Sequence, residues 1–300
     1  MPDRPARAPA AGLLLLMTPV IWGATFPAAK VALEHVTPWT FVAWSRGLGL
    51  VAIAAVLLVR RPPRAAWTPG LVPAGVLLGG LMTAGYVLQT VGIDHTSATN
   101  AGFITVLYVV LAPAGAALIG RHTPDGVDVV CLALALAGLA LLSIRGEGLR
   151  EGDLIVLASA AAFAAHIVAV DVLVDRHAAA PLALAQMAAS AVLTAAIALP
   201  MGAQAGEVAS LWRIFLLTGV LGSGIAFSVQ VMAQRSLSPV RASILLAAEA
   251  LVAALVAAIW LGERLSARAW VGAAAVLAAI AISELHPRRR RAKGHGRIAR

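Results

Sequence analysis

The stretch Leu88–Ile104, LQTVGIDHTSATNAGFI, places a cluster of hydrogen-bonding side chains between two long apolar runs. Amides, hydroxyls and charged groups interrupt a chain that is strongly hydrophobic on both sides of them. Such a cluster is either a single turn between two helices or one copy of a pattern that is repeated along the chain. The overall composition and the presence of a second copy distinguish these two interpretations.

The composition is that of a membrane protein. Hydrophobic residues make up 60% of the 300 positions, charged residues only 12%, and the mean hydropathy is +0.88. A soluble domain has about 25% charged residues, because it must keep its surface in water. A chain this apolar therefore has lipid as its main solvent. The single cysteine, Cys131, leaves no internal disulfide and no cysteine-based metal site.

The apolar runs have the length of membrane spans. A helix needs roughly 20 apolar residues to cross the hydrocarbon core. Cutting the chain at proline, glycine and charged clusters leaves runs of about that length, joined by short connections. We therefore predict an all-α integral membrane protein with ten transmembrane helices, near residues 12–33, 39–60, 70–92, 98–120, 126–144, 152–174, 180–201, 211–234, 238–261 and 268–285.

The quoted stretch has a counterpart 141 residues further on, VQVMAQRSLSPVRASIL at Val229–Leu245. In this register Gln89 falls on Gln230, and Tyr108 falls on Glu249. The other pairs are Trp22 with Phe163, Thr25 with His166, Phe26 with Ile167, and Tyr86 with Phe227. A nearly constant register across several spans predicts two copies of a five-span unit. Because five is odd, the second copy enters the membrane from the opposite side, and such inverted repeats place their substrate site near the midplane at the repeat interface.

The basic residues predict the orientation. Ten spans put both termini on the same side, and the tail HPRRRRAKGHGRIAR follows the last apolar run. Lys and Arg favour the cytoplasmic side of a membrane protein. Placing the termini in the cytoplasm puts the larger share of basic residues there, so we expect a multi-pass protein of a bacterial cytoplasmic membrane. The tail is then a retention signal that contacts anionic lipid, and nucleic acid is not expected as a partner.

Three segments resemble the ten-span members of the drug/metabolite transporter superfamily of the EamA type. They are WGATFPAAK in the first span, TSATNAGFITVLYVVLAP leading into the fourth, and SPVRASILLAAEALVAALVAAIWLGERLS in the ninth. The resemblance covers residues 12 to 285 and implies an exporting secondary carrier for small metabolites, amino acids or drugs. It divides the chain into two EamA-type repeats, 1–145 and 146–286, and a basic cytoplasmic tail, 287–300. The chain departs from the family pattern at Ala250, often a proline, and at His122, commonly an acid.

Charged side chains inside a span are candidates for function, because a charge at the centre of a lipid-facing helix costs roughly 2.5–3.5 kcal/mol on insertion scales. Arg46 lies inside the second span, where its guanidinium would hold a substrate carboxylate. It would alternatively snorkel to the interface or pair with an acid. Glu249 is the acid placed deepest in the membrane, and removal from water favours the neutral form of a carboxyl group. We therefore expect Glu249 to couple protons or bind a cation, the alternative being a structural pair with Arg46.

The sixth span adds His166, a second candidate for proton coupling and substrate binding. The alternative is a histidine whose ring is satisfied by a neighbouring polar group. Asp171, further along the same span, is equivalent to Lys30 in the first repeat. Both lie toward helix ends, so we expect both to reach the interface, with a gating pair as the alternative.

Neutral polar and aromatic residues complete the predicted cavity. Gln89 and Gln230 are equivalent by the repeat and are expected to contact the substrate rather than only to join helices. Trp22 and Tyr86 are expected to form aromatic walls. Asn100 is a weaker candidate, because its position near the start of the fourth span also suits a helix cap.

Enzymatic functions find no support in the sequence. It contains no H-E-x-x-H, no suitable G-x-S-x-G and no phosphate-binding loop, so neither catalysis nor coupling to ATP is expected, and no cofactor or metal is predicted. We predict a secondary transporter that exports small metabolites by alternating access, with protons and lipid as its further partners. An uncoupled carrier and a non-transporting membrane scaffold or sensor remain the alternatives.

Overall fold

The computed structural model describes residues 8–143 and 151–285, and every element in these ranges is helical. The predicted basic tail, 287–300, lies outside them. In the first repeat the helices are α1 (Ala8–Leu15), α2 (Met17–Ala32), α3 (Pro38–Arg60), η1 (Arg64–Ala66), α4 (Leu71–Asp94), α5 (Ala98–Thr105), α6 (Tyr108–Leu118) and α7 (Gly126–Ser143). In the second they are α8 (Glu151–Leu173), α9 (Ala179–Ala198), α10 (Ala205–Ser210), α11 (Trp212–Phe215), η2 (Leu216–Ala226), α12 (Phe227–Gln234), α13 (Pro239–Leu246), α14 (Ala248–Trp260) and α15 (Ala267–Leu285).

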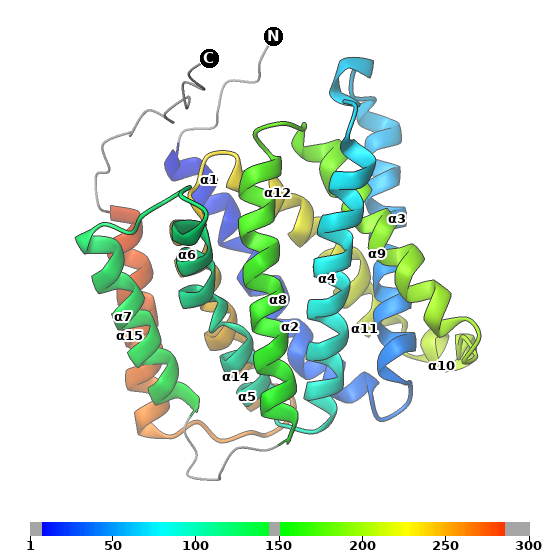
Figure 1. Ribbon diagram of the computed structural model, residues 1–300. Coiled ribbons are helices and arrows are strands. Elements are labelled where there is room, and N and C mark those ends of the chain that lie inside the picture. Colours follow the sequence, from blue (N-terminus) through cyan, green and yellow to red (C-terminus); the bar gives the residue numbers. More distant parts are fainter. Residues whose placement is uncertain (1–7, 144–150, 286–300) are drawn as a thin grey trace, which may run out of the picture.

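The prediction of an all-helical membrane protein is confirmed. Within the described ranges, nine helical stretches are long and apolar enough to span a bilayer, and Gly126–Leu141 of α7 is a shorter apolar helix. α7 packs along α15 at one side of the bundle (Figure 1). The observed ends differ from the predicted spans by only a few residues, because prolines, glycines and N-cap hydroxyls end the apolar runs.

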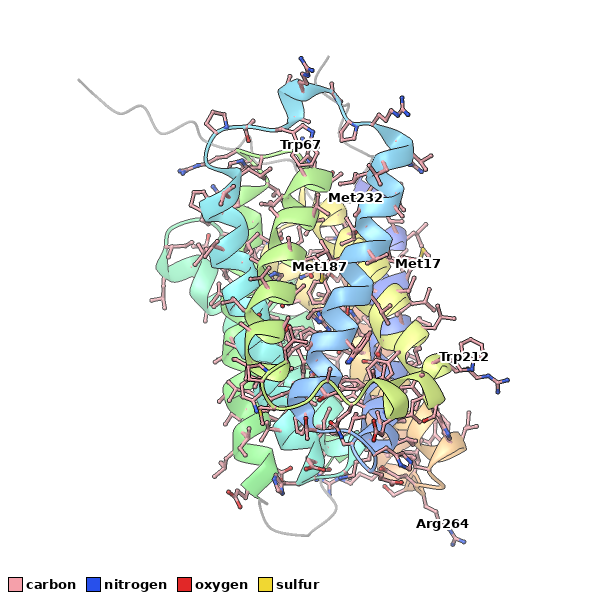
Figure 2. All side chains as sticks on the ribbon, turned by 90° about the vertical axis from the view of Figure 1, so that its right-hand side faces the viewer. Met17, Trp67, Met187, Trp212, Met232 and Arg264 are labelled. Atoms are coloured by element: carbon pink, nitrogen blue, oxygen red, sulfur yellow. The ribbon has the colours of Figure 1, made fainter. Side chains whose placement is uncertain are left out.

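Apolar side chains cover the outside of the bundle, and polar side chains are buried within it. Val59 and Leu118 are among the exposed hydrophobic residues, whereas Ser190 and Thr194 are completely buried. In Figure 2, Met17 and Met232 lie at the surface and Met187 lies inside. This distribution is the reverse of a soluble protein's and suits a surface in contact with lipid.

The two described ends of the chain lie at the same end of the bundle (Figure 1). α1 begins there and α15 ends there, and a Cβ atom on Gly12 would come within 2.4 Å of the Glu284 carboxylate. The connections α3–α4, α6–α7, α8–α9 and α12–α13 also lie at this end, which we call the terminal end of the bundle. This arrangement agrees with an even number of membrane crossings.

The fourth and ninth spans are interrupted at equivalent positions. α5 gives way to α6 at Val106–Leu107, and α13 gives way to α14 at Ala247, which is 141 residues after Val106. Equivalent serines also cap the two spans, since the Ser97 hydroxyl accepts the Asn100 N–H at 3.1 Å and the Ser238 hydroxyl accepts the Arg241 N–H at 3.4 Å. The repeat detected in the sequence is therefore present in the local backbone.

Two glycines of α4, four residues apart, allow close helix packing. A Cβ atom on Gly75 would lie 2.6 Å from the Ala185 Cβ, and one on Gly79 would lie 2.6 Å from the Gln186 carbonyl oxygen. α4 and α9 thus approach each other with almost no side chain between them, as in other close helix contacts in lipid. Their counterparts η2 and α3 do the same through Gly49 and Ser223.

Candidate functional site

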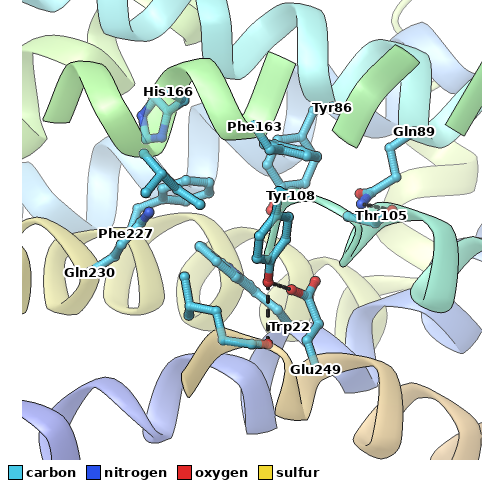
Figure 3. Close-up of a pocket in the computed structure, with 12 residues that line it drawn as sticks. Trp22, Tyr86, Gln89, Thr105, Tyr108, Phe163, His166, Phe227, Gln230 and Glu249 are labelled. Carbon is cyan, nitrogen blue, oxygen red and sulfur yellow. Dashed lines mark hydrogen bonds between the residues drawn. The ribbon is translucent and has the colours of Figure 1, made fainter. Parts of the chain in front are cut away.

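A small cavity lies at the centre of the bundle, where the two repeats meet (Figure 3). Its volume is about 20 Å³, which is room for little more than one water molecule. In this conformation the cavity is too small for a metabolite, so it would have to expand before it could admit a substrate. The side chains that line it are Trp22, Tyr86, Gln89, Thr105, Tyr108, Phe163, His166, Ile167, Phe227, Gln230, Leu246 and Glu249.

Most of the lining consists of residues that the repeat makes equivalent. The five pairs separated by 141 positions are Trp22 with Phe163, Tyr86 with Phe227, Gln89 with Gln230, Thr105 with Leu246, and Tyr108 with Glu249. Equivalent residues of an inverted repeat gather in one place only near the axis that relates the two copies. The cavity therefore lies at the repeat interface, where inverted-repeat transporters hold their substrates.

Aromatic contacts across the cavity follow the same symmetry. The rings of Trp22 and Phe227 lie 4.7 Å apart, and those of Phe163 and Tyr86 lie 5.1 Å apart. The second contact is the image of the first under the 141-residue shift. Each contact joins one repeat to the other, so these two ring pairs form matching walls on either side of the axis.

Tyr108 and Glu249 are equivalent residues that contact each other directly. The Tyr108 hydroxyl lies 2.8 Å from Glu249 Oε2 and 3.2 Å from the Leu246 carbonyl oxygen (Figure 3). Glu249 is 4% exposed and is the one acid lining this cavity in the described part of the chain. The alternative of an ion pair between Arg46 and Glu249 is wrong for this conformation, since no salt bridge joins these two described residues.

Arg46 lies beside a second cavity, adjacent to the first. Its guanidinium carbon lies 3.7 Å from the centre of the Tyr86 ring, and its side chain is 2% exposed. Neither Nε nor Nη1 has a hydrogen-bond partner among the described residues. Arg46 therefore neither snorkels to the interface nor pairs with an acid. The second cavity is lined by Thr25, Ala29, Phe41, Arg46, Tyr86, Gln89, Thr90, Ile93, Thr218 and Gly222, so Tyr86 and Gln89 line both cavities.

The two equivalent glutamines have different partners. Gln89 Nε2 donates to the Thr105 hydroxyl at 3.1 Å. In the second repeat Leu246 takes the place of Thr105, and Gln230 Oε1 has no hydrogen-bond partner within the described structure. A buried amide oxygen without a donor is available to a ligand N–H or to a water molecule.

The remaining predicted wall residues also border the central cavity. Trp22 donates from Nε1 to the Gly222 carbonyl oxygen at 2.9 Å, across to the π-helical segment η2. His166 Nε2 lies 3.0 Å from Gln186 Oε1, so its ring has the neighbouring polar partner that the structural interpretation required. One ring nitrogen of His166 is thus engaged while the side chain still lines the cavity.

Three other predicted residues lie away from both cavities. Asn100 lies in the first turn of α5, which Ser97 caps, and it lines neither cavity. Lys30 donates to the carbonyl oxygens of Ile93 and Asp94 at the C-terminal end of α4. Asp171 contacts Arg121 at 3.1 Å at the terminal end of the bundle. Lys30 and Asp171 therefore do not pair with each other.

Sequence reasoning did not select six residues of the central cavity, namely Thr105, Tyr108, Phe163, Ile167, Phe227 and Leu246. A usable signal was present, because all of them except Ile167 are 141-residue counterparts of another lining residue. Extending every predicted site residue to its counterpart would have found Tyr108, Phe163 and Phe227. No three His, Cys, Asp or Glu side chains within residues 8–143 and 151–285 come together as a metal site.

Comparisons with known proteins agree with the two-repeat architecture. The EamA-like transporter family matches residues 10–144 and again residues 150–285. A protein of Archaeoglobus fulgidus called "uncharacterized transporter" is 38% identical over 157 residues, which is 52% of this chain and 47% of that protein. A protein of known crystal structure superposes with a TM-score of 0.76 at 19% identity, covering 95% of this chain and 99% of the other. At that identity the superposition supports the fold alone.

Proposed function

Because this chain belongs to the EamA-like transporter family, we propose that it is a secondary transporter exporting small metabolites by alternating access, driven by proton exchange at Glu249. Amino acids and related compounds are the proposed substrates, and drugs are a further class. The observation that carries the proposal is the central cavity, lined by five pairs of equivalent residues with one buried carboxyl group among them. A scaffold has no use for a closed cavity on its symmetry axis that holds a buried carboxyl group.

Contacts between the repeats at both ends of the bundle support alternating access. At the terminal end, Arg121 of the first repeat contacts Asp171 and Asp175 of the second at 3.1 Å and 2.7 Å. Burial acts to lower the pKa of Arg121, but these carboxylates raise it above its ordinary value, so the guanidinium stays charged. At the opposite end the Thr96 hydroxyl donates to Asp153 at 2.7 Å. Rocking one repeat against the other would open one set of contacts while the other holds.

The position of Glu249 suits exchange of a proton against substrate. In the observed conformation Tyr108 donates to the carboxyl oxygen, so Glu249 has a hydrogen-bond donor without a cation. A substrate amine entering the cavity would replace Tyr108 as the donor, and a proton would satisfy the carboxyl group after the substrate leaves. Because Glu249 would bind either the substrate amine or a proton, but not both at once, movement of the substrate is coupled to movement of the proton.

We place both termini in the cytoplasm of a bacterial cytoplasmic membrane. The terminal end carries Arg60, Arg61, Arg64, Arg121 and Arg176 in its connections, which agrees with the preference of basic residues for the cytoplasmic side. The second cavity lies toward the other end, because Thr90 and Ile93 belong to the last turns of α4. Export then moves substrate from the terminal end to the end nearer this cavity.

The test is transport by the purified protein in proteoliposomes preloaded with pooled amino acids and related metabolites. Coupled export predicts faster efflux when the receiving side is made more acidic, and loss of that acceleration in Glu249→Gln. Arg264→Gln, at an exposed position labelled in Figure 2, is the matched control and should behave as the wild type. Efflux that ignores the gradient would support an uncoupled carrier instead. A folded preparation that moves no solute would support the scaffold or sensor.

A further inference from the structure

A groove on the outside of the bundle lies between α4, α6 and α8, and we infer that it holds one acyl chain of a membrane phospholipid whose phosphate binds Arg176. The volume of the groove is about 580 Å³, far larger than that of either central cavity. Because α8 packs against both α4 and α6, it forms the floor of the groove. Leu77 of α4 and Leu118 of α6 border it and are 52% and 88% exposed, so the groove opens toward the lipid.

The groove has the depth of one leaflet of the bilayer. Its floor follows α8 from Ala161 to Leu173, a distance of about 18 Å at a rise of 1.5 Å per residue. Half of the hydrocarbon core measures about 15 Å. Ala161 lies near the middle of α8, and Leu173 is its last residue, at the terminal end of the bundle (Figure 1). The groove therefore runs from the terminal end to the middle of the span, as an acyl chain of that leaflet does.

The equivalent part of the other half of the bundle is closed. Leu111 of α6 and Ala164 of α8 line the groove, and their 141-residue counterparts are Val252 of α14 and Gly23 of α2. A Cβ atom on Gly23 would come within 2.5 Å of the Val252 Cβ, so α2 and α14 are in direct contact. A Cβ atom on Gly115 of α6 would have a single neighbour within 4 Å among the described residues, an atom of α8 at 3.5 Å. The groove is thus a departure from the repeat and not a requirement of the fold.

An acyl chain suits this groove better than water or a protein helix does. Every lining residue is Leu, Ile, Val, Ala or Gly, so the side chains offer water no hydrogen-bond partner. A volume of about 580 Å³ along about 18 Å leaves a cross-section of about 30 Å², whereas a helix 10 Å across needs about 80 Å². A chain bordered by three helices also makes more dispersion contacts than one on the convex surface around it. This lipid is therefore retained longer than the lipid that coats the rest of the bundle.

An exposed cation lies at the terminal end of the groove. The Arg176 N–H donates to the carbonyl oxygen of Leu173, a lining residue, at 3.0 Å. The neighbouring acids Asp171 and Asp175 both contact Arg121, and no salt bridge joins Arg176 to another residue in the described part of the chain. A guanidinium at the membrane interface binds phosphate oxygens through charge-assisted hydrogen bonds. Arg176 thus supplies a headgroup contact at the level where the chain leaves the groove.

Photolabelling tests the inference without reference to transport. The purified protein is reconstituted into vesicles of phosphatidylethanolamine and phosphatidylglycerol that include a phosphatidylglycerol with a diazirine in its acyl chain, and labelled peptides are identified by mass spectrometry. We expect the label to concentrate on the groove residues of α6 and α8. Ala165→Phe fills the groove and should lower this labelling about tenfold, as for loss of roughly ten atomic contacts. Ala196→Phe, at an exposed position of α9, is the matched control and should not change it.

The headgroup contact is tested by a second pair of variants. Arg176→Gln should lower the groove labelling about fivefold, the contribution expected of one basic residue near a lipid surface. Arg64→Gln removes an exposed arginine at the same end of the bundle and should leave the labelling unchanged. A wild-type label spread evenly over the exposed helices would overturn the inference, even if Ala165→Phe failed to fold. If α6 and α8 escape the label and the protein is a dimer in native mass spectrometry, a second copy covers the groove and the inference is wrong.

Discussion

The two repeats have the same scaffold and different chemistry. Both interrupt their fourth helix at the same position, both cap it with serine, and both contribute one member to each of five cavity pairs. The charged groups beside the two cavities follow no such symmetry. Arg46 in the first repeat corresponds to Met187 in the second, and Glu249 in the second corresponds to Tyr108 in the first. In the proposed mechanism, the symmetric scaffold provides the cavity and the motion, and the residues that break the symmetry provide the charged groups that would recognise a ligand.

Exchanging the Arg46 and Met187 side chains should give the largest effect on folding. Met187 is completely buried, so Met187→Arg introduces an uncompensated buried cation and should destabilise the protein by about 3–5 kcal/mol. Arg46→Met removes a cation that already lacks an anion and should leave stability unchanged or higher. The thermal midpoint in detergent measures both. A large loss of stability in Arg46→Met would mean that Arg46 holds the fold together.

Variants of Tyr108 and Glu249 distinguish the effect of the carboxyl group on transport from the effect of the hydrogen bond between the two residues. Glu249→Gln should remove the response of transport to a pH gradient, about tenfold under an imposed difference of one unit, because the variant has no proton to exchange. Tyr108→Phe removes only the donor at 2.8 Å and should keep a gradient response of reduced size. Efflux rates with and without the gradient measure both variants. Equal loss in the two would show that the hydrogen bond, rather than the carboxyl group, controls coupling.

The scaffold was predictable because its causes are local. The lengths of the apolar runs predicted the spans, and hydroxyl-bearing residues and prolines predicted where the spans end. The 141-residue register predicted the axis between the repeats, where Tyr108 and Glu249 meet. The stack of Arg46 on Tyr86 was not predictable, because an almost uniformly apolar helix does not reveal which face meets which neighbour. The π-helical segment Leu216–Ala226 was missed for a similar reason: LLTGVLGSGIA is equally compatible with an α-helix.

The equivalent glutamines Gln89 and Gln230 test the difference between the two repeats through a single hydrogen bond. Thr105→Val removes the acceptor of Gln89 Nε2 and should destabilise the protein by about 1 kcal/mol. Leu246→Thr introduces the equivalent hydroxyl beside Gln230, whose Oε1 lacks a partner, and should satisfy that oxygen. If Gln230 Oε1 serves the substrate, the same change should weaken substrate binding several-fold, while Thr105→Val weakens it less. Thermal midpoints and binding curves for both variants decide this, and equal effects on binding would place the two glutamines in the same role.

The helix caps affect stability alone, by an amount similar to that of Thr105→Val, and they give the strictest test of scaffold symmetry. Ser97 and Ser238 accept N–H groups three residues later at 3.1 Å and 3.4 Å, at the starts of α5 and α13. Replacing an N-cap serine by alanine costs about 1 kcal/mol, so Ser97→Ala and Ser238→Ala should lower stability by similar amounts. They should add in the double variant, because the two caps lie on different connections at opposite ends of the bundle. Unequal losses would show that the two interrupted helices, although built alike, do not contribute equally to the packed state. The motion would then be concentrated in the repeat whose cap contributes less.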